Sequence, residues 1–320
     1  MPKVRRARRF RGLRLFLLAL AALLVAFVWW LFSPPTQNAP TISSPPATLP
    51  ASPEPPTRAP KAVAAGEHCD LGMADAAARN RDGLQNLAIA PYRRTETGWA
   101  AYGPLVASTI GTRCSPGSPG FASRLSAWQS VHSLPPTGVI GTSEMQALML
   151  VWQRERPFAV ASVGRCPDPP AESRLTTVPV ADAYGGKVML IRPGALAAYE
   201  RMLGAARAEE PAVAADPQLM KIFSAYRSPA ADAGRCALEN NCQNLVRAAC
   251  SAHRTGLAMD LDLSSAPGAK IDASDDANRR AIVQGPAYLW MAANAHRFGF
   301  VPYPFEPWHW EWTGEPVETR

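Results

Sequence analysis

One uncharged apolar segment, residues 15–32, most strongly restricts how this chain can fold. As a helix the segment would extend about 27 Å, close to the hydrocarbon thickness of a bilayer. Trp29 and Trp30 lie at its end, where aromatic side chains favour the membrane interface. The alternative is a cleaved signal peptide, but its apolar core is usually shorter, and Ser33-Pro34-Pro35 follows at once. We therefore expect an uncleaved transmembrane anchor.

Basic residues gather in front of this segment. The chain has a net charge of +7, and residues 1–14 contain seven basic side chains and no acidic one. By the positive-inside rule, residues 1–14 stay cytoplasmic, and the chain after Phe32 lies on the periplasmic side of the inner membrane. The remaining residues carry equal numbers of basic and acidic side chains. Such a balanced body offers no distributed counter-charge to phosphates, so we expect no nucleic-acid partner.

Residues 33–66 are predicted to form a linker. Ten prolines fall between positions 34 and 60, with Thr, Ser and Ala among them. This composition favours extended polyproline II, which would reach about 80 Å over residues 34–60. We expect a spacer that holds the folded part away from the membrane. A cleaved pro-segment is the alternative.

The six cysteines suit disulfides in an exported chain, because their number is even and no CxxC pair is present. Three fall in residues 69–166 and three in residues 236–250. Pairing within each group would leave one cysteine over on each side. Either two thiols stay free or one bridge joins the groups, and Cys166 is the natural candidate for that bridge.

Residues 67–166 are predicted to form a small helical domain. A first helix has apolar residues at helical spacing: Phe121, Leu125 and Trp128. After a Pro-Pro turn, Thr142 is expected to cap a second helix with Glu144 in its first turn. The apolar face of this helix consists of Met145, Leu148 and Trp152.

Residues 121–155 resemble the helical peptidoglycan-binding module found beside many cell-wall hydrolases. Trp-Gln occurs on both sides of the Pro-Pro-Thr-Gly-Val-Ile-Gly turn, at 128–129 and 152–153. Short motifs of this kind also occur by chance. A plain helical packing domain is the alternative.

Residues 170–316 mix helical and strand periods, which predicts an α+β domain. Residues 195–208 and 286–298 have the pattern of helices, and residues 257–263 and 308–312 alternate as strands do. The residues whose chemistry suggests a function lie in and around these two strands.

The first strand carries a potential pair of metal ligands. Within residues 257–263, Asp260 points away from the apolar residues beside it, because side chains alternate along a strand. Gly256 permits the bend that brings His253 back beside Asp260. An imidazole and a carboxylate placed in this way could be two ligands of one divalent metal.

The second strand offers a third ligand, His309. Strand alternation places Glu311 on the same side as His309 and three core-packing indoles on the other: Trp308, Trp310 and Trp312. Two His and one Asp leave one position open for a water molecule, as catalytic zinc sites do. Glu306 is near enough to reach that water, and Glu311 is a rival base.

A third segment, Tyr226-Arg227-Ser228, supplies a cation. An arginine in a cleft would suit a substrate carboxylate, or the oxyanion that forms when a peptide carbonyl is attacked.

With this segment the chain, over about residues 190–312, resembles the zinc D-alanyl-D-alanine carboxypeptidases and dipeptidases of the vancomycin-resistance type. The motifs that carry the resemblance are Tyr226-Arg227-Ser228, Ser251-x-His253-x-x-Gly256-x-Ala258-x-Asp260 and Glu306-x-Trp308-His309.

The resemblance implies a small antiparallel sheet flanked by helices. It implies a Zn²⁺ site whose ligands are His253, Asp260 and His309. It further implies that Glu306 is the general base and that Arg227 stabilises the transition state. We also expect Ser251 and Tyr226 to bind substrate; for Tyr226 the alternative is a place in the core. The family's usual substrates are D-Ala-D-Ala ends, or other peptide bonds of the peptidoglycan stem.

Two departures from the family pattern concern specificity more than metal chemistry. The family often continues Tyr-Arg-Ser with an aromatic residue and a Gln, whereas this chain has Pro229-Ala-Ala-Asp232. The segment 234–250, with its three cysteines, also looks unlike a compact family member. Both segments lie where the substrate would bind.

The sequence therefore predicts a membrane-anchored, outward-facing zinc peptidase, in which a helical domain (67–166) precedes a peptidase domain (170–316). The expected reaction is D,D-carboxypeptidase removal of a terminal D-Ala from peptidoglycan stem peptides. One alternative is an endopeptidase of the same family. Another is a non-catalytic cell-wall-binding or scaffold protein that keeps the fold.

Overall fold

A computed structural model describes residues 67–238, 242 and 250–318. The predicted basic segment, anchor and linker, residues 1–66, lie outside the described residues. In the described part, no helix combines the length and apolar character needed to cross a membrane. Helices and a small antiparallel sheet make the described part an α+β fold, as predicted.

The N-terminal part of the described chain is mostly helical. Its α-helices are α2 (Ala74–Asn86), α3 (Gly103–Ile110), α4 (Pro119–Val131), α5 (Thr142–Glu155) and α6 (Pro157–Ala161). Two short strands pair between α2 and α3, each next to a 3-10 turn: β1 (Ala88–Ile89), η1 (Pro91–Arg93), β2 (Glu96–Thr97) and η2 (Ala100–Tyr102).

Local sequence explains where α4 and α5 begin. Ser118 caps α4, since its Oγ accepts a hydrogen bond from the Phe121 amide at 3.3 Å. The prediction that Thr142 caps α5 is wrong, because Gly141 is the cap and Thr142 the first helical residue. The Glu144 carboxylate accepts from the Gly141 amide at 2.9 Å, which is the half of a capping box that needs no side chain on the cap residue. The predicted apolar faces of both helices are buried: Phe121, Leu125, Trp128, Met145, Leu148 and Trp152.

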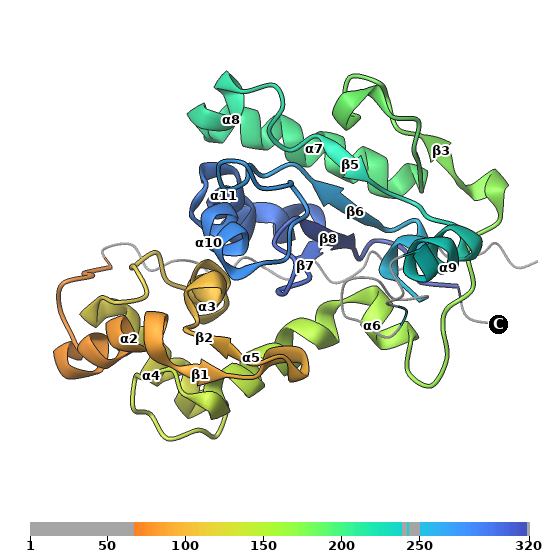
Figure 1. Cartoon of the computed structure of the whole chain (residues 1–320). Helices are drawn as coiled ribbons and strands as arrows, with labels where there is room; N and C mark the ends of the chain where they lie inside the picture. The colour runs from red at the N-terminus through yellow and green to blue at the C-terminus, as the bar shows by residue number, and fades with distance from the viewer. Residues whose placement is uncertain (1–66, 239–241, 243–249, 319–320) are drawn as a thin grey trace, which may run out of the picture. The chain divides into compact units, whose positions relative to one another are not determined.

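The C-terminal part contains an antiparallel sheet in the order β5-β6-β8-β7 (Figure 1). Its strands are β5 (Ile222–Ser224), β6 (Ala258–Leu261), β7 (Phe300–Pro302) and β8 (His309–Trp312). Its helices are α7 (Pro193–Glu209), α8 (Pro211–Ala215), α9 (Pro229–Leu238), α10 (Asp276–Gln284) and α11 (Pro286–Asn294), the last followed by the 3-10 turn η6 (Ala295–Phe298). The predicted strands correspond to β6 and β8, and the predicted helices to α7 and to α11 with η6.

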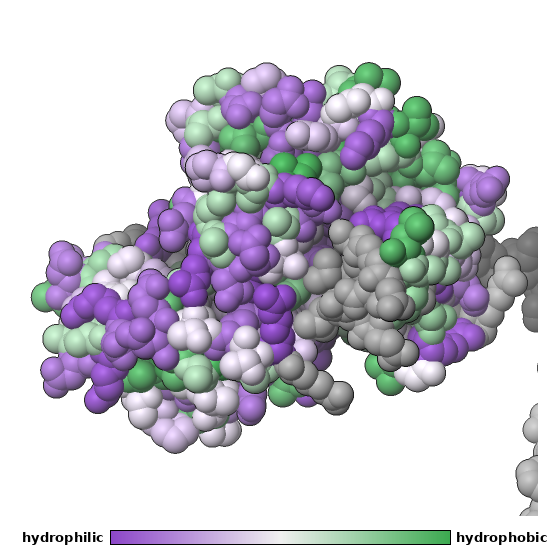
Figure 2. All heavy atoms as spheres, viewed as in Figure 1, coloured by the Kyte–Doolittle hydropathy of each residue, from purple (hydrophilic) through white to green (hydrophobic). Residues whose placement is uncertain are grey.

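A separate two-stranded hairpin precedes α7. It consists of β3 (Thr176–Thr177) and β4 (Leu190–Ile191), with the 3-10 turns η3 (Glu172–Arg174) before it and η4 (Tyr184–Gly186) within it. Figure 2 shows hydrophobic residues gathered near β3. Elsewhere on this face, hydrophobic and hydrophilic residues are interspersed. Val180 and Val188, in the segment between the two strands, are 71% and 85% exposed. Large apolar groups of the hairpin connection therefore face solvent.

The two central strands have one apolar and one polar face. β6 and β8 pair so that Met259 is opposite Trp310 and Asp260 is opposite His309. Because side chains alternate along a strand, the first pair points to one face and the second pair to the other. Trp310 packs against Tyr288 of α11, with ring centroids 6.3 Å apart. The helical layer thus covers the apolar face and leaves Asp260 and His309 on the opposite one.

Buried contacts join the N-terminal and C-terminal parts. Helix α3 packs against α11, and the buried apolar residues of both parts form one continuous cluster. Arg279 of α10 pairs with Glu96, with Nη1 3.0 Å from Oε2, and also donates to the Tyr102 hydroxyl at 2.8 Å. The division into domains at residues 67–166 and 170–316 stays a prediction.

The cysteines form three disulfides among the described residues. Cys166 pairs with Cys250 and so joins the two parts, as predicted for Cys166. The other bridges lie within one part each: Cys69–Cys114 and Cys236–Cys242. No cysteine of the described residues is left as a free thiol.

Candidate metal centre

Three buried side chains from three elements meet on the polar face of the sheet. His253 lies in the 3-10 turn η5 (Ala252–Thr255), Asp260 in β6 and His309 in β8. One potential ligand atom from each lies within 4.8 Å of the others. The structure therefore brings together the three residues that the sequence predicted as metal ligands.

The backbone after η5 explains how His253 reaches Asp260. Gly256 ends the turn with a φ of 68°, in the left-handed region where a residue with a Cβ is strained. A Cβ here would also lie 3.0 Å from Leu175 Cδ2 and 3.1 Å from Arg192 Cγ. Glycine thus allows the chain to reverse between His253 and β6.

Asp260 lies between the two imidazoles. Its Oδ2 is 3.1 Å from His253 Nε2, and its Oδ1 is 2.9 Å from His309 Nδ1. On the other side of its ring, His253 Nδ1 is 2.7 Å from the Ala225 carbonyl oxygen. Because a carbonyl can only accept, His253 Nδ1 carries the proton and the lone pair of Nε2 faces Asp260.

This set of donors fits a divalent metal. Two imidazole nitrogens and one carboxylate are ligand types of catalytic zinc sites, which keep a further position for water or substrate. The hydrogen bond from His253 to Ala225 is the kind of outer contact that orients a metal-binding imidazole. The two rings are nearly perpendicular, with centroids 4.8 Å apart, so both can face one point.

The electrostatics favour a neutral His253 and an ionised Asp260. Burial, helped by the Arg227 guanidinium, lowers the pKa of His253 to about 4. Burial by itself would raise the pKa of Asp260, but the two imidazoles hold it below its ordinary value. Burial also lowers the pKa of His309, yet Asp260 and Glu311 outweigh this and raise it to about 9. His309 would therefore release a proton on metal binding.

Glu306 lies in the turn that leads into β8. Its carbonyl accepts a hydrogen bond from the His309 amide at 2.8 Å, and its own amide donates to Tyr303. The side chain is half-buried, and loss of hydration raises its pKa to about 7. A carboxyl group with such a pKa can accept and return a proton near neutral pH.

A polar cavity of about 200 Å³ opens onto the cluster. Its lining includes four predicted site residues: Arg227, His253, Asp260 and Glu306. Trp308 also borders this cavity, although the sequence pattern placed it with Trp310 on the far side. Trp308 is nonetheless buried in the same apolar cluster as Trp310. Lys187 and Arg235, which the sequence pattern did not indicate, contribute two further cations to the lining.

Arg227 is held in place by three side chains. Its Nε is 2.9 Å from Asp232 Oδ1, and its Nη1 is 2.7 Å from Ser224 Oγ. Its Nη2 is 3.4 Å from Ser251 Oγ, which in turn donates to Asp232 Oδ2 at 2.8 Å. Asp232 is buried on α9, so the departure from the family pattern at this position supplies the partner of Arg227.

The two residues predicted to bind substrate lie beside the cavity lining. Ser251 contacts Arg227 and Asp232, as described above. Tyr226 is half-buried, and its amide donates to the Leu190 carbonyl of β4 at 2.8 Å. Neither is among the residues that line the cavity. Their part in substrate binding stays a prediction.

Glu311, the rival base, is occupied elsewhere. It is 1% exposed and accepts hydrogen bonds from Arg156 Nε at 2.7 Å and from the Phe158 amide at 3.0 Å. Burial by itself would raise the pKa of Glu311, but Arg156 and His309 hold it below its ordinary value. Glu311 is therefore an ionised partner of Arg156, which suits it poorly to shuttle protons.

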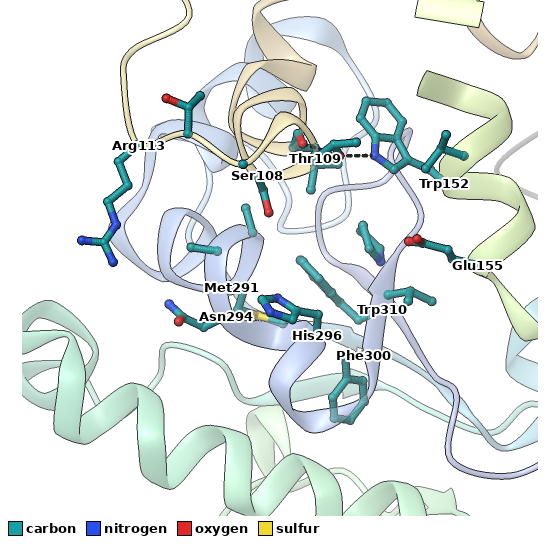
Figure 3. A pocket seen from close by; sticks show the side chains of 18 residues that line it. Ser108, Thr109, Arg113, Trp152, Glu155, Met291, Asn294, His296, Phe300 and Trp310 are labelled. Atoms are coloured by element: carbon teal, nitrogen blue, oxygen red, sulfur yellow. Dashed lines mark hydrogen bonds between the residues drawn. The ribbon is translucent and has the colours of Figure 1, made fainter. Parts of the chain in front are cut away.

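A larger cavity of about 380 Å³ lies where α3 and α5 meet α11 and β7 (Figure 3). Trp152 borders it and donates a hydrogen bond to Thr109 at 2.8 Å. Trp310 also borders it, so this cavity is on the apolar side of β8, opposite His309. None of the three clustered metal-ligand candidates lines it.

Comparison with known proteins concerns the C-terminal part of the chain. No curated protein matches the chain in a sequence search. Residues 189–315 match the family described as VanY, D-alanyl-D-alanine carboxypeptidase. The matched segment contains the three clustered residues together with Glu306 and Arg227. Residues 189–315 are therefore a domain of the VanY D-alanyl-D-alanine carboxypeptidase family.

Proposed function

We propose that this domain is a zinc-dependent D,D-carboxypeptidase that removes the terminal D-Ala from peptidoglycan stem peptides. The observation that carries the proposal is the buried cluster of His253, Asp260 and His309, which opens onto a polar cavity together with Glu306 and Arg227. All five residues lie in the segment that matches the family.

Glu306 moves the proton in this proposal. A zinc ion held by His253, Asp260 and His309 would polarise the scissile carbonyl and make water more acidic. The Glu306 carboxylate takes a proton from the attacking water, whose oxygen forms a bond to the carbonyl carbon. When the C–N bond breaks, Glu306 returns the proton to the leaving amine. The products are the shortened stem peptide and free D-Ala.

Arg227 stabilises the negative charge that develops on the carbonyl oxygen. Its guanidinium lines the cavity, and its contacts with Asp232 and Ser224 fix its direction. A cation that is already oriented needs little reorganisation when charge develops, which favours the transition state. Lys187, also at the cavity, is suited to bind the C-terminal carboxylate of the substrate.

The decisive experiment replaces the proton carrier. We expect Glu306→Ala to lose hydrolysis of a pentapeptide muropeptide while it still binds about one zinc ion per chain, because Glu306 is not a ligand. The assay measures D-Ala release and zinc content together. Glu200→Ala, which removes an exposed glutamate of α7, is the control and should keep both. Retained hydrolysis in Glu306→Ala would refute the assigned role.

Mass spectrometry of digested wall fragments tests which bond is cut. Loss of one D-Ala from pentapeptides supports the carboxypeptidase, whereas cleavage of cross-links identifies an endopeptidase of the same family. A chain that binds zinc and leaves every fragment intact is a scaffold or wall-binding protein.

An extracytoplasmic location is part of this proposal. The three disulfides suit an oxidising compartment, where such bridges persist. Anchoring through residues 15–32 and wall binding through residues 67–166 stay predictions. Binding of the purified chain to insoluble peptidoglycan, with and without zinc, would test the second of these.

A further inference from the structure

The carboxylate of Glu311 is unusually well held for a residue with no catalytic task. It lies two positions after His309 on β8, so both side chains are on the same face of the sheet. Its Oε1 is 3.6 Å from His309 Nε2, which is too long for a hydrogen bond. This ring nitrogen is nonetheless buried and has no hydrogen-bond partner among the described residues. The Glu311 carboxylate is thus a negative charge that lies close to this nitrogen.

The N-terminal part of the chain sets the direction of this carboxylate. Arg156 grips Oε1 with two nitrogens, Nε at 2.7 Å and Nη2 at 2.6 Å. The Phe158 amide binds the other oxygen, Oε2, at 3.0 Å. Both donors come from the junction of α5 and α6, which lies outside the segment that matches the family. With both oxygens bound, the carboxylate has little freedom to rotate away from His309.

Arg156 is itself fixed by further contacts. Its Nη1 donates to Gln153 Oε1 at 2.9 Å, and its guanidinium carbon is 4.1 Å from the centroid of the Tyr303 ring. Tyr303 meets the His309 ring edge to face, with centroids 5.9 Å apart, and its amide donates to the His309 carbonyl at 2.9 Å. Arg156 thus supports His309 by two routes, through Glu311 and through Tyr303.

We infer that Arg156 and Glu311 are positioning residues of the metal centre, so that residues 67–166 contribute to metal binding. The inference rests on the proposed metal site. The carboxylate favours the form of His309 in which Nε2 carries the proton, and this leaves the lone pair of Nδ1 directed towards Asp260 and the metal. His253 has the matching arrangement, with the Ala225 carbonyl in the place of Glu311.

The competing explanation is that the ion pair only holds the two parts of the chain together. A matched control exists, because Glu96 and Arg279 form a second buried ion pair between the same two parts, at 3.0 Å. Glu96 is bonded to Tyr102 and Arg279 rather than to a candidate ligand. A purely structural role predicts that Glu311→Gln and Glu96→Gln behave alike.

The experiment measures zinc affinity of the full-length protein by competition with a chromophoric chelator. We expect Glu311→Gln to weaken zinc binding by about 10- to 100-fold, the usual effect of losing an outer partner of a metal-bound imidazole. It should also change the visible spectrum of the cobalt-substituted protein. Glu96→Gln should lower the unfolding temperature and leave zinc affinity and the cobalt spectrum as in the wild type.

A milder variant guards against misfolding of Glu311→Gln. Arg156→Lys keeps the charge but lacks the two guanidinium nitrogens that contact Glu311 Oε1. Zinc affinity should therefore fall by a smaller factor than in Glu311→Gln. Unchanged zinc affinity in both Glu311→Gln and Arg156→Lys would overturn the inference while leaving the proposed function intact. A wild-type chain that binds no zinc would overturn both.

Discussion

At the scale of single residues, the neighbours of Arg227 decide what it can do. The motif Tyr226-Arg227-Ser228 identified a cation, and the contacts with Asp232, Ser224 and Ser251 show that it is fixed in direction. The sequence did not identify Asp232 as the partner of Arg227. Asp232 lies five positions after Arg227, and the turn between them has no regular spacing that would predict the contact. A pair of this kind becomes visible only once the start of α9 is known.

This fixed cation leads to a kinetic prediction. Arg227→Ala should lower kcat by about 100- to 1,000-fold, as loss of one oriented charge partner of an oxyanion usually does. Zinc stoichiometry should stay near one, because Arg227 is not a ligand. Steady-state kinetics and metal analysis of the same preparation check both statements. Arg227→Lys is the control for charge alone and should fall between the wild type and Arg227→Ala.

At the scale of elements, the turn between η5 and β6 positions the site. Its two ends, His253 and Asp260, were recognisable from spacing, and Gly256 indicated the reversal between them. The structure adds the second reason for glycine, which is the close approach of Leu175 and Arg192. Both come from distant parts of the chain, so no local pattern could have revealed the crowding.

The turn can be tested by adding one methyl group. Gly256→Ala should reduce the free energy of unfolding by more than the roughly 1–2 kcal/mol expected for a left-handed backbone alone. Gly268→Ala is a matched control, because Gly268 has a φ of +78° and no atom within 4 Å of an added Cβ. Denaturant unfolding of the metal-free proteins gives the difference between the two. Equal losses of unfolding free energy in the two variants would mean that the Leu175 and Arg192 side chains move aside at no cost.

At the scale of the whole molecule, the Cys166–Cys250 bridge and the contacts of α3 with α11 join the N-terminal part to the C-terminal one. The sequence indicated that one bridge could cross between the two groups of cysteines, and Cys166 was its natural candidate. It did not indicate the partner, because six cysteines allow many connectivities. The fold selects Cys250, just before the turn η5 that carries His253.

The bridges should differ in their effect on stability. The Cys166–Cys250 bridge closes a separation of 84 residues, so replacing both cysteines by serine should cost about 4 to 5 kcal/mol in the chain-entropy description. The Cys236–Cys242 bridge spans 6 residues, and its double serine variant should lose about 2 kcal/mol. Chemical denaturation of both variants under non-reducing conditions measures the two values. A larger loss for the short bridge would contradict this order.

The sequence by itself predicted several of the helices, the two central strands and the candidate ligands. Helical spacing marked the buried faces of α4 and α5, and alternation marked β6 and β8, because both patterns depend only on how a backbone repeats. The same alternation placed Asp260 and His309 on the polar side of their strands, and the motifs indicated the candidate metal ligands and Glu306.

Only the tertiary structure decided what surrounds them. The contact of Arg156 with Glu311 joins residues 155 positions apart, and the pairing of Cys166 with Cys250 joins residues 84 apart. Such pairs form because packing brings distant segments together, and local periodicity carries no record of which segments meet. From the sequence, Glu311 was therefore a candidate general base. In the folded chain it is bound to Arg156 beside His309.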